Sequence, residues 1–338
     1  MIGKAIQQLV KKEDLSLELT KQAMDQIMTG KADPVQIASF LVALRMKKET
    51  IEEITAAAMV MREHCKALKT DFDVLDIVGT GGDEANTFNI STVSAFIIAA
   101  AGFPVAKHGN RSVSSKCGSA DLLEALGVKL DLEVKECSEL LKKSNICFLF
   151  APVYHASMRY AAPVRRELGI RTIFNILGPL ANPASASLQL LGVYHEDLVM
   201  PLARVLANLG VKRGMVVHGH DGLDELSLTS PSTVCEIKNG ELHKFIFDPA
   251  EYGFSYCQPE ELVGGDPKEN AVIAEKILNG EKGPKRDIVI LNSALALTIA
   301  DGNLSIKEAI DLARQMIDSG KAKAKMQELV ELSQRLSA

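Results

Sequence analysis

Residues suited to phosphate binding gather in the stretch from Gly79 to Asp121. Two segments rich in glycine, serine and asparagine lie there, separated by a short apolar segment. No acidic residue occurs between Glu84 and Asp121, although acidic residues outnumber basic ones in the chain as a whole, whereas Lys107 and Arg111 fall inside this window. The stretch therefore predicts a binding site for a small anion.

The first of the two segments has the backbone chemistry of a phosphate-binding loop. The glycines of Gly79–Gly82 let the main chain turn its N–H groups toward a ligand. The polar side chains of Thr87–Thr92 come just before an expected buried helix over Val93–Ala101, and the N-terminus of a helix attracts anions. Taken alone, this loop is equally compatible with simple turns and a helix cap. The second segment, inside the same acid-free window, favours the anion site.

Composition and charge bound the kind of protein. The 338 residues are 47% hydrophobic and 24% charged, which is typical of a soluble globular protein with one large and one smaller domain. A formal net charge of -5 argues against a nucleic-acid or anionic-membrane partner. The six cysteines form no C-x-x-C pair, and no apolar run suits a signal or a membrane span. We therefore expect a cytoplasmic protein with reduced thiols and no membrane partner.

The first seventy residues indicate helices only. Apolar residues recur at helical spacing over Leu19–Met28, and the Asp33–Pro34 pair suits the start of a second helix. Thr50 with Glu53 matches a capping box for a third. We expect a small all-helical domain over residues 1–70.

Strands and helices alternate from residue 71 onward. Helical patterns separate short apolar runs that indicate buried strands, namely Val74–Val78, Cys147–Phe150, Leu188–Val193 and Met215–His218. This alternation predicts an α/β domain over residues 71–338, with a mostly parallel sheet flanked by helices. Ligands bind such sheets beyond the carboxyl ends of the strands, where the glycine loop after Val78 would lie.

Residues 155–185 interrupt the alternation with helix and turn signals. We expect this segment to join the N-terminal helical domain and to place Arg165 and Arg166 at the seam between the domains, a common location for substrates. Asn239–Gly240 marks a turn between two strand-like runs, and helices follow to the end of the chain.

These motifs resemble those of the anthranilate phosphoribosyltransferases, enzymes of tryptophan biosynthesis. The similar segments span more than half of the chain and are GTGGD at Gly79–Asp83, TFNIST at Thr87–Thr92, KHGNRSVSSKCGSAD at Lys107–Asp121, RRELGIRTIFNILGPLANPA at Arg165–Ala184 and the acidic pair Asp224–Glu225. The resemblance implies transfer of the phosphoribosyl group of phosphoribosyl pyrophosphate (PRPP) to the amine of anthranilate. The products would be N-(5-phosphoribosyl)anthranilate and diphosphate.

The resemblance also implies a role for individual residues. PRPP would be bound by Gly79, Gly82, Asp83, Thr87, Asn89, Ile90, Ser91, Thr92, Lys107, His108, Gly109, Asn110, Arg111, Ser112, Val113, Ser114, Ser115 and Ser119. Anthranilate would contact Gly79, Asn110 and Arg165. Two Mg²⁺ ions would be held by Ser91 and by Asp224 with Glu225.

The chemistry of these residue types is compatible with those roles. Departing diphosphate needs neutralisation, which Mg²⁺ on hard oxygen ligands supplies. Spacing alone favours a solvated acidic turn for Asp224–Glu225, and only the resemblance favours the metal site. Arg165 can pair bidentately with a carboxylate, whereas we expect Arg166 to be a surface charge. His108 is the one candidate for accepting the proton of the amine, and its alternative role is a ligand contact or support of the loop.

Two other functions stay open. Pyrimidine nucleoside phosphorylases have a similar fold and bind a phosphorylated ribose, but their reaction releases no diphosphate and needs no Mg²⁺ for it. A non-catalytic relative that binds nucleic acid would need a basic surface, which this acidic chain does not suggest. The resemblance also implies a homodimer formed through the helical domain, although the apolar helices seen in the sequence could equally pack internally.

Overall fold

The computed structural model describes residues 1–112 and 115–337, so Val113 and Ser114 lie outside the described residues. The described strands form one seven-stranded sheet in the order β3-β2-β1-β4-β5-β6-β7. These strands are β1 (Leu75–Gly79), β2 (Val105–Gly109), β3 (Ile146–Phe150), β4 (Leu188–Gly192), β5 (Arg213–Gly219), β6 (Ser232–Lys238) and β7 (Glu241–Phe247). Neighbours from β3 to β5 pair in parallel, and the pairs β5–β6 and β6–β7 are antiparallel. The predicted mostly parallel sheet is confirmed.

One strand was not predicted. The glycine- and serine-rich motif that starts at Lys107 suggested a loop from that residue, but Val105–Gly109 forms β2, and the loop starts only after Gly109. Lys107 and His108 interrupt the apolar pattern that marks a buried strand, yet both are buried, at 3% and 5% exposure. The prediction was wrong here because polar residues inside a strand are compatible with burial where the fold supplies hydrogen-bond partners.

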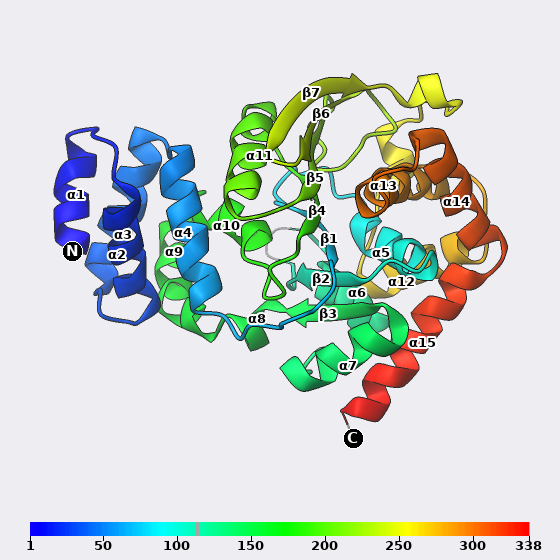
Figure 1. The fold of residues 1–338 in the computed structure, drawn as a ribbon, viewed down its shortest axis with the longest axis horizontal. Coiled ribbons are helices and arrows are strands. Elements are labelled where there is room, and N and C mark those ends of the chain that lie inside the picture. The colour runs from blue at the N-terminus through cyan, green and yellow to red at the C-terminus, as the bar shows by residue number, and fades with distance from the viewer. Residues whose placement is uncertain (113–114, 338) are drawn as a thin grey trace.

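Helices cover both faces of the sheet (Figure 1). One face carries α5 (Ile90–Ala100) and α13 (Pro284–Ala300), with α14 (Ile306–Asp318) and α15 (Lys321–Leu336) packed outside them. The other face carries α10 (Phe174–Leu180) and α11 (Val199–Asn208). Helix α5 is buried throughout Thr92–Ala99, as its apolar sequence predicted. The remaining elements after residue 100 are α6 (Ser119–Ala125), α7 (Val134–Ser144), α8 (Ala151–Tyr154), η1 (Ala156–Tyr160), α9 (Ala162–Leu168), η2 (Glu196–Leu198), η3 (Pro249–Tyr252), η4 (Pro259–Leu262) and α12 (Pro267–Leu278).

The N-terminal part is a bundle of helices, as predicted. Its helices are α1 (Ile2–Val10), α2 (Leu17–Met28), α3 (Pro34–Lys47) and α4 (Ile51–Glu63), of which α1 was not foreseen. Asp33 and Thr50 each form a capping box at the start of their helix. No helix in the described residues is both long enough and apolar enough to cross a membrane.

The segment 155–185 packs onto these N-terminal helices. Element η1 contacts α2, α9 contacts α3, and α10 contacts α4. The apolar side chains of all these helices belong to one hydrophobic cluster that continues through α11 to one face of the sheet, at Leu191 and Val216. Because this cluster includes both helices and strands, the division of the chain near residue 70 stays a prediction.

Candidate active site

The predicted segments meet at one edge of the sheet. Strand β1 lies between β2 and β4, and the register places Gly79 opposite Gly192, so these strands end at the same level. From β1 the chain adds β2 and β3 on one side of this strand, and it then adds β4 and β5 on the other side. The carboxyl ends of β1 and β4 are therefore the topological switch point, where α/β proteins bind ligands. The first loop leaves β1 here, and the second loop leaves the neighbouring β2.

The acidic pair lies directly on the ends of β1 and β4. A Cβ atom added at Gly192 would lie 1.6 Å from the Asp224 carbonyl oxygen, and one added at Gly79 would lie 2.3 Å from Asp224 Oδ2. The Gly81 N–H donates to Asp224 Oδ2 at 2.7 Å. Glu225 is only 9% exposed. The pair is therefore not a solvated turn, and both strand ends must be glycine for it to approach so closely.

The environment of this pair disfavours its negative charge. Burial raises the pKa of Asp224 to about 7 and that of Glu225 to about 8, and the charge of Asp83 adds to both shifts, while Lys107 opposes the shift of Glu225. Close carboxylates in a buried position favour a bound cation. No group of three or more His, Cys, Asp or Glu side chains in residues 1–112 and 115–337 is arranged to hold a metal ion. Mg²⁺ takes few protein ligands and keeps several waters, so a carboxylate pair suits it.

Lys107 connects the sheet to helix α5. Its Nζ donates to the Ile77 carbonyl at 2.5 Å and to Ser91 Oγ at 3.2 Å. Burial lowers the pKa of Lys107, while the charges of Asp76, Glu225 and Asp224 act in the opposite direction. Lys107 is thus a strand residue whose ammonium group donates to Ser91, and it does not extend from a loop.

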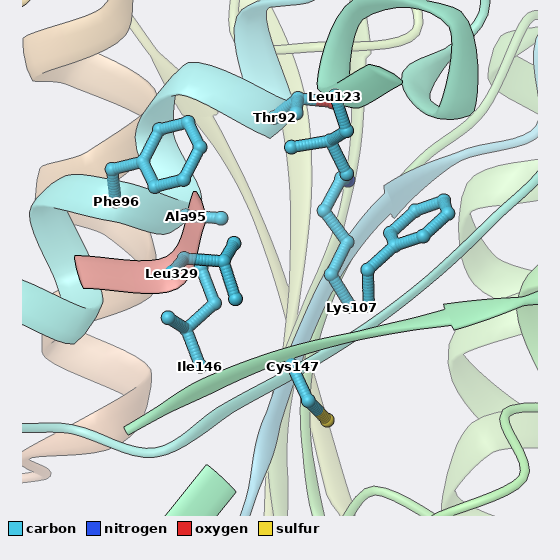
Figure 2. Close-up of a pocket in the computed structure, with 9 residues that line it drawn as sticks. Thr92, Ala95, Phe96, Lys107, Leu123, Ile146, Cys147 and Leu329 are labelled. Atoms are coloured by element: carbon cyan, nitrogen blue, oxygen red, sulfur yellow. The ribbon is translucent and has the colours of Figure 1, made fainter. Parts of the chain in front are cut away.

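A small cavity lies beside Lys107 (Figure 2). Its volume is about 10 Å³, which is close to the space of one water molecule. Thr92 and Lys107 supply its polar lining, and Thr92 Oγ1 is buried without a hydrogen-bond partner in the described structure. Apolar side chains such as Phe96 and Leu123 form the rest of the wall. The cavity is too small for a substrate.

Asp76 is a buried residue that the sequence analysis did not single out. Its Oδ1 accepts the backbone N–H of His108 at 3.2 Å, and its Oδ2 accepts Asn182 Nδ2 at 2.7 Å. Asn182 Nδ2 also donates to the Ala106 carbonyl at 2.8 Å. Burial raises the pKa of Asp76 to about 6, although Lys107 and these hydrogen bonds oppose the shift. An acid inside the apolar run VLDIV was the signal that could have revealed it.

Asn89 ties the two loops together. Helix α5 begins at Ile90, so Ser91 and Thr92 lie in its first turn. The Thr92 N–H donates to the Asn89 carbonyl at 3.1 Å. Asn89 is the N-cap residue but makes no side-chain cap. Instead its Nδ2 donates to the Cys117 carbonyl at 3.0 Å, and its Oδ1 accepts Asn270 Nδ2 at 3.0 Å. The amide thus fixes the second loop and α12 relative to the first loop.

The second loop is held by acidic residues from helix α6. Arg111 Nη1 lies 2.9 Å from Asp121 Oδ1 and 2.7 Å from Glu124 Oε2, which raises the pKa of the guanidinium. The Ser112 N–H donates to Asp121 Oδ2 at 3.0 Å, and Ser119 Oγ donates to the Asn110 carbonyl at 3.3 Å. Arg111 is thus held by two carboxylates of α6.

Arg165 lies on α9, and its guanidinium carbon is 5.2 Å from the centre of the Phe174 ring. Burial lowers its pKa. Neither a salt bridge nor a side-chain hydrogen bond engages Arg165 among the described residues. A partly buried guanidinium without an acceptor suits a carboxylate ligand.

His108 lies beside a second buried histidine, His155, at a ring distance of 5.0 Å. His108 Nδ1 is 3.2 Å from the Gly178 carbonyl, which can only accept, so Nδ1 carries the proton. Burial lowers the pKa of His108 to about 3 and that of His155 to about 4. A base with so low a pKa is poorly matched to proton transfer at neutral pH, which favours the supporting role for His108.

Comparison with known families matches nearly the whole chain. Residues 71–323 match the α/β domain of a glycosyl transferase family, and residues 4–65 match the helical bundle domain of the same family. An anthranilate phosphoribosyltransferase of Ruminiclostridium cellulolyticum is 63% identical over 333 residues, covering 98% of both chains.

Solved structures agree with the sequence comparison. An anthranilate phosphoribosyltransferase of Thermus thermophilus superposes with a TM-score of 0.93 at 43% identity, covering 98% of this chain and 99% of its own. The enzyme of Saccharomyces cerevisiae in complex with PRPP and Mg superposes with a TM-score of 0.91 at 31% identity, covering 99% of this chain and 98% of its own. The chain belongs to the anthranilate phosphoribosyltransferase family.

Membership in the anthranilate phosphoribosyltransferase family confirms the predicted resemblance and does not favour the pyrimidine nucleoside phosphorylase alternative. The structure brings the first loop, the start of the second loop and Asp224–Glu225 together at one edge of the sheet. Besides Asp76, the sequence analysis missed Gly192 and Arg171, which contact the Asp224 carbonyl and the Gly82 carbonyl. No local pattern marks these two, because each is needed by a segment distant in the sequence.

Proposed function

We propose that this chain transfers the 5-phosphoribosyl group of PRPP to the amine of anthranilate, a step of tryptophan biosynthesis, with release of diphosphate. The main support for the proposal is the position of Asp224–Glu225 against the glycine ends of β1 and β4, where Asp224 accepts a hydrogen bond from the glycine loop. A donor whose leaving group is a polyanion needs this combination of backbone donors and carboxylates in one place.

PRPP would lie across the two loops and the first turn of α5. The N–H groups of Gly82 and Asp83, together with the partial positive charge at the start of α5, would attract the phosphate oxygens. Asn110–Ser119 supplies the hydroxyl groups and the charge of Arg111. Lys107 and Asn89 would support the loops without contacting PRPP directly, because their polar atoms form hydrogen bonds within the protein.

The residues at the strand ends fit Mg²⁺. Asp224, Glu225 and Ser91 offer hard oxygen atoms, and burial together with the nearby Asp83 makes the carboxylates unfavourable without a cation. Bound Mg²⁺ would neutralise the departing diphosphate. Two ions are the expected number, one at Ser91 and one at the carboxylate pair.

Anthranilate would bind on the side of α9 and α10. Arg165 would pair with its carboxylate, and Gly79 and Asn110 would contact it from the two loops. An aromatic amine is a weak nucleophile, so we expect departure of diphosphate to run ahead of attack. The protein would then act by alignment and electrostatics, without a covalent intermediate.

The proposal also includes a homodimer and a cytoplasmic location. The N-terminal helices expose large apolar side chains, including Val10, Val35 and Met46 at 71%, 74% and 77%. This supports a homodimer formed through the helical domain, which we place at residues 1–70 with residues 155–185. The larger domain is residues 71–338. We expect the protein in the cytoplasm, with PRPP and anthranilate as small-molecule partners and no nucleic acid or membrane partner.

A direct assay tests this function. Purified protein is mixed with PRPP, Mg²⁺ and anthranilate, and the loss of anthranilate fluorescence is followed. We expect turnover that stops when EDTA is added. Parallel incubation with thymidine and phosphate is the control, and activity there without activity on anthranilate would overturn the proposal.

A further inference from the structure

Arg171 links the segment that carries Arg165 to the glycine loop. It lies between α9 and α10, and its Nη2 donates to the Gly82 carbonyl at 2.5 Å. Nη2 is also 3.8 Å from Glu84 Oε1, and the guanidinium carbon is 4.3 Å from the centre of the Tyr194 ring. One side chain thus contacts two residues of the loop while stacked on a residue that follows β4.

The loop needs such contacts, because its own conformation is unfavourable. Gly81 and Gly82 have φ values of 68° and 78°, and the non-glycine residues Glu84 and Asn86 have φ values of 60° and 53°. Left-handed backbone at non-glycine residues costs free energy and persists only where other interactions hold it. Gly81, Glu84 and Asn86 are also exposed, so packing alone does not fix the loop.

The two ends of the loop are anchored elsewhere. At its start, the Thr80 N–H donates to the Gly192 carbonyl at 3.0 Å, and Thr80 Oγ1 accepts the Tyr194 N–H at 3.2 Å. At its end, Thr87 forms a β-bridge with Val263, and the Phe88 N–H donates to the Leu262 carbonyl at 3.3 Å. Between these anchors, the Gly81 bond to Asp224 fixes one side of the turn, and Arg171 fixes the other.

We propose that Arg171 is a positioning residue that holds the glycine loop in the conformation that binds the phosphoribosyl donor. Because the Gly82 carbonyl accepts from Arg171, it points toward the guanidinium, and the N–H groups of Gly82 and Asp83 would be available to the phosphates of the donor. Arg171 acts through the loop and does not touch the reacting atoms. The kinetic part of this inference rests on the proposed function.

The sequence offers a matched control for this arginine. Arg166 lies on the same segment, is exposed, and makes no salt bridge or side-chain hydrogen bond among the described residues. Arg171→Lys keeps the charge but loses the planar stack on Tyr194, and Arg171→Ala removes both. Arg166→Ala removes a positive charge from the same segment without touching the loop.

Two measurements test the proposal. Hydrogen–deuterium exchange of the unliganded protein should become at least about tenfold faster over residues 80–88 in Arg171→Ala, because a hydrogen bond to a charged donor is lost. The KM for PRPP should rise about tenfold or more, the KM for anthranilate and kcat should change much less, and millimolar guanidinium should recover part of the loss. Arg171→Lys should show smaller changes than Arg171→Ala, and Arg166→Ala should match the parent protein.

Two results would contradict the proposed role of Arg171. Unchanged exchange over residues 80–88 in Arg171→Ala would overturn the positioning role, and so would equal rises in both KM values. The exchange measurement needs no substrate. If the parent protein fails to act on PRPP and anthranilate, the proposed function fails, while the effect of Arg171 on the loop is still decided by exchange.

Discussion

Replacing Gly192 by alanine tests whether the acidic pair is positioned by the glycine end of β4. The added Cβ would meet the Asp224 carbonyl oxygen at 1.6 Å and the Glu225 nitrogen at 3.2 Å. Carbon and oxygen atoms pack at about 3.5 Å, so the Asp224 backbone would have to retreat by about 2 Å. A main-chain clash cannot be relieved by rotating a side chain, and the whole turn that carries Asp224–Glu225 would move.

Two effects contribute to the expected loss of folding free energy. Overpacking of this kind costs about 1–3 kcal/mol of folding free energy. The retreat also breaks the 2.7 Å bond from the Gly81 N–H to Asp224, and a hydrogen bond to a charged group contributes about 1.5–3 kcal/mol. The two effects concern neighbouring groups and do not simply add. We expect a loss of stability of a few kcal/mol and at least about tenfold weaker Mg²⁺-dependent binding of PRPP.

Urea unfolding measures the loss of stability, and calorimetric titration of PRPP at several Mg²⁺ concentrations measures the loss of affinity. Gly214→Ala is the matched control, because its Cβ would meet the Gln189 carbonyl at 2.8 Å, also a main-chain atom, at the opposite end of the sheet. That variant should lose stability but keep the affinity of its folded fraction for PRPP. If Gly192→Ala binds PRPP with unchanged Mg²⁺ dependence, the pair is not positioned as we argue.

Three further expectations concern single functional groups. Arg165→Ala should raise the KM for anthranilate far more than that for PRPP in steady-state kinetics, and equal effects would remove its proposed role. Asp224→Asn combined with Glu225→Gln should shift the Mg²⁺ dependence of activity to higher concentration, whereas an unchanged metal titration would argue against the site. Burial lowers the pKa of His155 to about 4 from its ordinary value of 6.5, so the unfolded chain binds a proton more readily between these values. The stabilisation from the neutral ring is present above pH 6.5 and is lost as the pH falls toward 4, by up to about 1.4 kcal/mol per pH unit. His155→Gln should flatten this part of the pH profile of urea unfolding, and an unchanged slope would contradict the burial argument.

Most of the sheet could be predicted because its strands are short apolar runs bounded by turn residues. That rule identified β1, β3, β4 and β5, and the Asn239–Gly240 turn identified the β6–β7 hairpin. It failed at β2, since the burial of Lys107 depends on the Ile77 carbonyl and Ser91, which lie on other elements. A local pattern cannot report partners that only the folded sheet brings close.

The candidate site shows the same limit. The glycine loop and the acid-free window are local features, so composition alone indicated an anion site. The importance of Gly192 depends on Asp224, and the importance of Arg171 depends on Gly82, across long sequence separations. For Asp224–Glu225 the local pattern was misleading, because spacing favoured a solvated turn and the fold buries Glu225. Only the family resemblance favoured the acidic pair as a functional element.

The two halves of the site belong to different hydrophobic clusters. Phe88 and Ile90, which lead the donor loop into α5, pack in the cluster on one face of the sheet. Val164 and Phe174, which flank Arg165 on the acceptor segment, pack in the cluster that includes the N-terminal helices. The two clusters meet within β4, where Leu190 belongs to the first cluster and Leu191 to the second. In the proposed reaction, the relative placement of the two substrates would therefore depend on β1 and β4 and on side chains such as Arg171 that connect the two segments.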